Sequence, residues 1–201
     1  MSPRRLYEEE LKQLQESVEE MGMGVRATYA RLFSALQQQK ESVIEEIIAS
    51  DQSTHTLQRR IEGSCLNLIT KQQPIARDLR QVSASLKVVT DISRIGDQCS
   101  DIAELVKRMH FKDLQEFSAH IPQMIEETGK QLTEAINAFV DRNAESAQHV
   151  VAGDDTVDDL FNQVKNDVIA HLRSEAKDPD DCIDVMMFAK YLEKIGDHAV
   201  N

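Results

Sequence analysis

Acidic side chains recur at helical spacing in four segments of the chain, and their type and spacing could bind a metal ion. Two segments carry a pair of residues four apart: Asp51 with His55, and Asp154 with Asp158. Two others carry three oxygen-bearing side chains at four-residue intervals: Ser93, Asp97 and Asp101, then Glu193, Asp197 and Asn201. Residues four apart share a helix face. Carboxylates and an amide, without thiolates, are the hard oxygen ligands that iron, manganese, magnesium or calcium take.

The faces that carry these acids leave two interpretations open. On a helical wheel Asp51 shares its face with Ile44 and Ile47, and Asp154 shares its face with Phe161. A carboxylate on an apolar face is costly unless it is paired, capped or metal-bound. Asp97 and Asp197 lie opposite the apolar stripes of their segments, where a solvated acid is the simpler interpretation. Metal binding is favoured because both halves of the chain repeat the same combination.

An internal repeat connects the two halves. Arg94-Ile-Gly-Asp97 recurs 100 residues later as Lys194-Ile-Gly-Asp197, and Ile48-Ala-Ser-Asp51 matches Val151-Ala-Gly-Asp154 at an offset of 103. Two matched blocks at nearly one offset predict a tandem repeat of one supersecondary unit. The glycine before each key aspartate would permit close approach of a neighbouring helix or of an ion.

The elements that position these residues are expected to be helices. The chain has no Trp, 4% aromatic residues, seven Gly and four Pro, a composition that favours helix over sheet. We expect an all-α fold of six helices at residues 3–38, 41–70, 75–109, 123–141, 144–176 and from 179 onward. Short polar joints force antiparallel neighbours. The chain is therefore expected to form two tandem three-helix bundles, residues 1–110 and 111–201, with the last helix truncated by about two turns relative to its counterpart.

Composition also excludes several classes of function. The 35 Asp and Glu outnumber the 23 Lys and Arg, giving a net charge of -12, which argues against binding nucleic acid or an anionic membrane. No secretory signal or spanning apolar run is visible, and three separated cysteines without a CxxC pair predict a reducing cytoplasm. Walker A, GxSxG and Glu-x-x-His motifs are absent, so neither a P-loop enzyme nor a ferritin-like oxidase is indicated.

The chain resembles the PhoU family of phosphate-uptake regulators. The resemblance lies in Arg94–Asp97 and Tyr191–Asn201, which are similar to the family's twin signatures, and in Gln73–Arg80 and Gly153–Leu160. It implies two three-helix bundles related by pseudo-twofold symmetry, with multinuclear metal clusters bound through E/D-x-x-x-D motifs. It further implies a non-enzymatic cytoplasmic protein, often a homodimer and at most peripheral to the membrane. Such proteins restrain the phosphate ABC transporter and its partner sensor histidine kinase.

Carried onto this sequence, the resemblance assigns nine metal ligands: Asp51, His55, Asp97, Asp101, Asp154, Asp158, Glu193, Asp197 and Asn201. Iron is the first expectation, with manganese, magnesium, zinc or calcium as alternatives. His55 and Ser93 replace acids that the family pattern carries, so we expect a weaker site in the first half. The alternative function is a metal-free helical interaction scaffold whose acids are solvated. An oxygen-ligand metalloenzyme ranks last, because the sequence places no nucleophile or acid–base pair.

Overall fold

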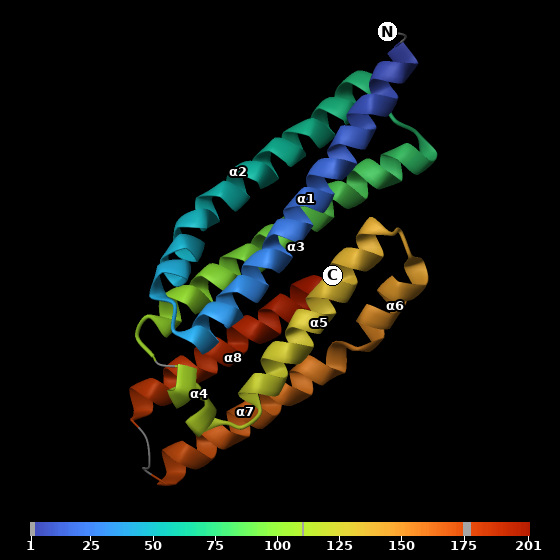
Figure 1. Ribbon diagram of the computed structural model, residues 1–201. Coiled ribbons are helices and arrows are strands. Elements are labelled where there is room, and N and C mark those ends of the chain that lie inside the picture. The colour runs from blue at the N-terminus through green and yellow to red at the C-terminus, as the bar shows by residue number, and fades with distance from the viewer. Residues whose placement is uncertain (1–2, 110, 175–177) are drawn as a thin grey trace.

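The structure is a computed structural model that describes residues 3–109, 111–174 and 178–201. The described residues form helices and no strands, as the composition predicts. The first three helices are α1 (Pro3–Gln38), α2 (Glu41–Gln72) and α3 (Ala76–Val106). The others are α4 (Phe111–Phe117), α5 (Ile121–Val140), α6 (Ala144–Ala152), α7 (Asp154–Ser174) and α8 (Pro179–Val200). Helices α1 to α3 pack on each other as one bundle, and α5, α7 and α8 form the second (Figure 1).

The helix ends follow local chemistry. Helix α2 stops where Gln73 adopts a left-handed conformation and its N–H donates to the carbonyl of Ile69, just before Pro74. Proline disfavours helix at the residue before it. Helix α8 begins at Pro179, where the side chain of Asp178 accepts a hydrogen bond from the N–H of Asp180. An N-cap acid followed by proline is a strong helix start.

Two features differ from the expected six helices. The segment expected as one helix over 144–176 is broken at Gly153 into α6 and α7, and its expected end lies outside the described residues. The N–H of Gly153 faces the carbonyls of His149, Val150 and Val151, which closes α6. The short α4 was not expected. Leu114 and Phe117 of α4 are both buried, so packing in the core holds a helix too short to form alone. The division into residues 1–110 and 111–201 stays a prediction.

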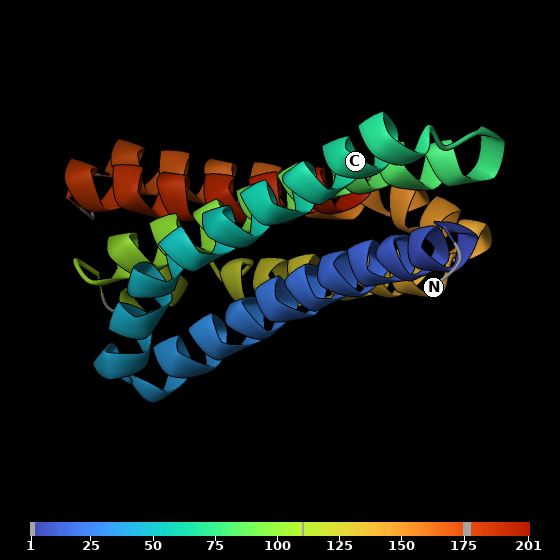
Figure 2. The same cartoon turned by 90° about the horizontal axis from the view of Figure 1, so that it is seen from above.

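The two bundles share a hydrophobic core through α3 and α8, which lie side by side in the middle of the molecule (Figures 1 and 2). Two polar contacts show their relative direction: His198 Nδ1 of α8 lies 3.0 Å from Asp91 Oδ1 of α3, and Arg108 Nη2, just after the end of α3, lies 3.3 Å from Asp184 Oδ1 of α8. Because the later residue of one helix meets the earlier residue of the other, α3 and α8 are antiparallel. The helices that carry both oxygen runs are thus packed directly on each other.

Helices α1 and α5 form a second contact between the bundles. Tyr29 is buried, and its hydroxyl donates a 2.7 Å hydrogen bond to the carbonyl of Ile125. Gly129 lies under the Tyr29 ring, where an added Cβ would come within 2.8 Å of Cε1. The hydrogen bond fixes the ring, so the ring cannot easily move away.

Replacing Gly129 with alanine is therefore expected to lower the free energy of unfolding by about 1–3 kcal/mol, the usual cost of overpacking. Urea denaturation at equilibrium measures it. Gly24→Ala is the matched control, because nothing lies within 4 Å of an added Cβ there. That change should stabilise the α1 helix by about 0.5–1 kcal/mol. A neutral or stabilising Gly129→Ala would show that α1 and α5 are not held together as described.

Candidate functional site

In the first bundle, α2 and α3 bring His55 and Asp97 together. His55 Nε2 lies 3.2 Å from Asp97 Oδ1, and His55 Nδ1 lies 3.2 Å from the hydroxyl of Ser93. Ser93 is buried, and the Asp97 side chain is 20% exposed. Arg94 Nη1 lies 3.3 Å from the other carboxylate oxygen of Asp97. The imidazole thus stands between the serine and the aspartate.

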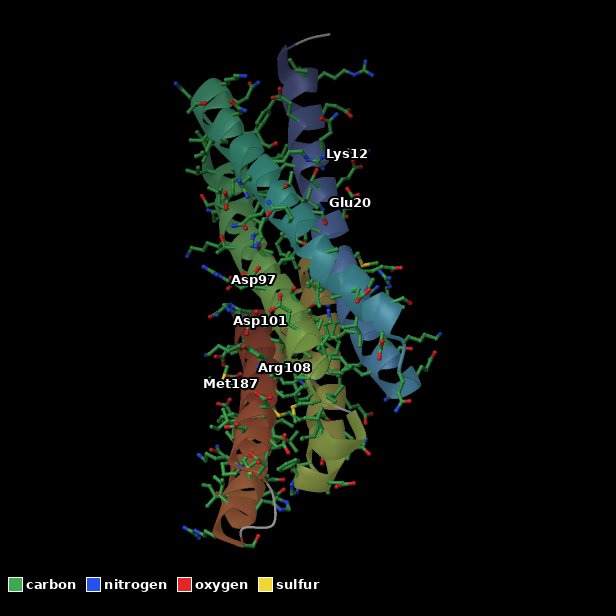
Figure 3. The ribbon with its side chains drawn as sticks, turned by 90° about the vertical axis from the view of Figure 1, so that its left-hand side faces the viewer. Lys12, Glu20, Asp97, Asp101, Arg108 and Met187 are labelled. Carbon is green, nitrogen blue, oxygen red and sulfur yellow. The ribbon has the colours of Figure 1, made fainter. Side chains whose placement is uncertain are left out.

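The structure gives less detail on the other two predicted ligands of the first bundle. Asp101 is half-buried one turn beyond Asp97 on the same side of α3 (Figure 3). Asp51 lies in α2 one turn before His55, but its side chain is outside what the structure describes. Their role as ligands stays a prediction.

In the second bundle, α7 and α8 bring three carboxylates together. Asp158, Glu193 and Asp197 each offer one oxygen, and these three oxygens lie within 4.8 Å of one another. Asp158 is exposed, whereas the Glu193 side chain is only 13% exposed. Asp154 lies one turn before Asp158 and is half-buried. Asn201 ends α8 and is exposed, and its backbone N–H donates to the carbonyl of Asp197.

The acids of the second bundle destabilise each other's charged forms. Burial, and then the carboxylate of Asp197, raise the pKa of Asp154. Burial, and then the carboxylates of Asp154 and Glu193, raise the pKa of Asp158. Like charges close together oppose ionisation, and a bound cation would reverse this effect. The cluster therefore has the electrostatic character of a cation site.

Two lysines that the sequence pattern did not single out complete this cluster. Lys190 Nζ lies 2.5 Å from Glu193 Oε2, and the ammonium of Lys194 contacts Asp197 Oδ2. The hydrogen bond to Asp197 is the main cause that raises the pKa of Lys194. Each lysine precedes its acid by three residues, a spacing that places side chains together on a helix. This spacing was the signal in the sequence that would have identified them.

The glycines beside the key aspartates serve helix packing. A Cβ on Gly96 would lie 3.3 Å from Cγ2 of Thr54 on α2. A Cβ on Gly196 would lie 2.9 Å from Oε1 of Gln131 and 3.3 Å from Cγ1 of Val157. Of the two interpretations that the sequence left open, the structure supports the close approach of neighbouring helices.

A family model described as the PhoU domain matches residues 18–106 and 121–201. The chain belongs to the PhoU family. The first matched segment contains the His55–Asp97 contact, and the second contains the three-carboxylate cluster of Asp158, Glu193 and Asp197. This result confirms the resemblance seen in the sequence. It also answers the question of catalysis, because PhoU is a family of regulatory accessory proteins and not of enzymes.

Named relatives match the chain along nearly its whole length. It is 31% identical to the phosphate-specific transport system accessory protein PhoU homolog of Clostridium acetobutylicum, over 98% of this chain and 91% of that one. It is 28% identical to PhoU homolog 1 of Methanothermobacter thermautotrophicus, over 99% of this chain and 91% of that one. Over the described residues, no helix is long and apolar enough to span a bilayer.

Solved PhoU structures confirm the fold. The crystal structure of PhoU from Pseudomonas aeruginosa superposes with a TM-score of 0.90 over 97% of this chain and 94% of that chain. The phosphate transport system regulatory protein PhoU from Streptococcus pneumoniae gives a TM-score of 0.87 over 97% and 92%. Both are 23% identical in sequence.

Proposed function

We propose that this chain is an accessory protein of a phosphate transport system and that it binds metal ions through its carboxylate clusters. The first part is supported by the PhoU relatives, whose names describe accessory proteins of phosphate-specific transport and which match at least 98% of the chain. The acid excess of the chain suits partners that are cations or basic protein surfaces.

Metal binding is supported by one observation above all: three carboxylate oxygens from two helices converge in the second bundle. Oxygen ligands at this separation can surround a hard cation whose ligand distances are about 2.0–2.6 Å. Asp158, Glu193 and Asp197 would hold the ion, with Asp154 one turn away. In the first bundle Asp97 and His55 would hold it. Ser93 is a weaker ligand there because it is neutral.

Elemental analysis of protein purified without chelator tests this proposal. We expect iron or another of the hard divalent ions to copurify, and chelator treatment followed by manganese to restore the bound metal. Protein that carries no metal and takes up none on reconstitution would favour the alternative, a helical interaction scaffold whose acids are solvated. In that case the transport role would still be supported by the relatives.

The finer functional expectations follow from the family resemblance. We propose that the protein restrains the phosphate ABC transporter and keeps the partner sensor histidine kinase quiet when phosphate is plentiful, and that it works in the cytoplasm as a homodimer. The acidic faces would repel a free phosphate anion unless a cation bridged it. A bound metal would therefore also be the feature that lets phosphate approach this surface.

A further inference from the structure

Two ammonium groups lie against the oxygens that a metal in the second bundle would need. Lys190 Nζ lies 2.5 Å from Glu193 Oε2, and Lys194 Nζ lies 3.6 Å from the same oxygen while also contacting Asp197 Oδ2. An ammonium donates to the same carboxylate lone pairs that a metal ion would occupy. A metal and these lysines therefore compete for Glu193 and Asp197.

The first bundle repeats the arrangement in a reduced form. Arg94 stands at the position equivalent to Lys194 and pairs with Asp97 at 3.3 Å. Thr90 stands at the position equivalent to Lys190, so the second lysine has no basic counterpart. The bundle with more acids thus carries more bases three residues before its acids. The basic residues therefore occur where the acids occur, and are not simply part of a general surface charge.

Both lysines can leave the cluster without disturbing the core. Their side chains are 40% and 41% exposed, so the ammonium groups reach solvent by rotation of the stem. Lys190 Nζ also lies 5.3 Å from the centre of the Phe161 ring. The face of an aromatic ring attracts a cation at this distance, so Lys190 contacts the ring and Glu193 from the same position.

We propose that Lys190 and Lys194 are built-in counter-ions that neutralise the acid cluster without metal and are displaced when metal binds. The inference rests on the proposed metal-binding function and adds the regulation of that site. The lysines stabilise the metal-free protein by offsetting repulsion among the acids. The same contacts weaken metal binding, because the ion must first release them. Ions of low charge are penalised most, since their gain at the same oxygens is smaller.

The test uses the full chain carrying K190M and K194M together, because methionine keeps much of the stem and removes the charge. Calorimetric titration with Mn²⁺ after chelator removal should show binding about tenfold tighter than in the wild type, as expected for two partly exposed ion pairs. In chelator, the same variant should have a lower melting temperature than the wild type. Each single variant should show smaller changes in Mn²⁺ affinity and melting temperature, in the same directions. The single variants replace the double variant in the test if the double variant folds poorly.

K165M is the matched control. Lys165 is half-buried on the neighbouring helix α7, and its ammonium donates an exposed hydrogen bond to Asn162 Oδ1 rather than to an acid of the cluster. It should leave both the Mn²⁺ affinity and the metal-free melting temperature unchanged. Equal tightening in K165M would show that general charge, not contact with the cluster, controls affinity, and would overturn the inference.

The outcomes separate the two proposals. Wild-type binding of Mn²⁺ with no tightening in the lysine variants overturns the counter-ion role alone. A metal-free melting temperature that stays equal or rises in the double variant does the same. Absence of Mn²⁺ binding in the wild type and in the lysine variants refutes the metal-binding proposal itself, and the counter-ion role with it.

Discussion

Replacing Asp197 with alanine is expected to remove more bound metal than replacing Asp97. Asp197 belongs to a cluster in which three carboxylate oxygens converge. Asp97 is in contact with His55, which sits between it and a neutral serine. The affinity of hard cations depends strongly on the number of charged oxygens, because these offset the desolvation of the ion. The second bundle should therefore hold its metal more fully.

The amount of metal bound per chain, measured for the two single variants, tests this prediction. Each protein is reconstituted with manganese, dialysed and analysed for metal per chain, beside an Asp159→Ala control that removes an exposed acid of α7 outside the cluster. A parallel series with zinc tests the effect of His55, since imidazole favours softer ions. Equal manganese losses, or a larger loss from Asp97→Ala, would mean that carboxylate number does not control occupancy.

Deleting the gene is expected to switch on phosphate-starvation genes in phosphate-rich medium. This expectation rests on the proposed role, in which the protein restrains the transporter and its signalling partner when phosphate is plentiful. A reporter of a phosphate-starvation promoter measures it, with the wild-type gene supplied from a plasmid to restore repression. The host should carry no other PhoU-family gene. Normal repression in that deletion strain would contradict the regulatory role.

Much of the fold could be predicted because apolar periodicity indicates the helices and short polar joints indicate where they end. The ends at Gln73 and Asp178 coincide with prolines, whose effect on the backbone is local and independent of the rest of the fold. The repeat of Asp97 in Asp197 predicted equivalent positions on α3 and α8. The helix ends depend on residues near in sequence, and the structure agrees with both of them.

The structure differs from the expectations where contacts between residues far apart in the sequence determine the conformation. The segment around Leu114 and Phe117 is too short to form a stable helix alone, and burial of both side chains in the core holds α4. The contact of His55 with Asp97 depends on the rotation of α2 against α3, which a single helical wheel does not give. The lysine contacts of α8 differ in kind, because the spacing of three residues that brings each lysine to its acid is visible in the sequence.

The break at Gly153 gives the two halves of the molecule different mechanical properties. Asp154 is the first residue of α7, directly after the break, whereas Asp51 lies in the interior of the uninterrupted α2. A helix interior resists local displacement because each turn is hydrogen-bonded to the next. Moving Asp51 would bend α2, but Asp154 can shift by changing the dihedral angles of one glycine joint. For the proposed metal sites, we therefore expect the second half to adapt to ions of different radius and the first half to keep the geometry that α2 imposes.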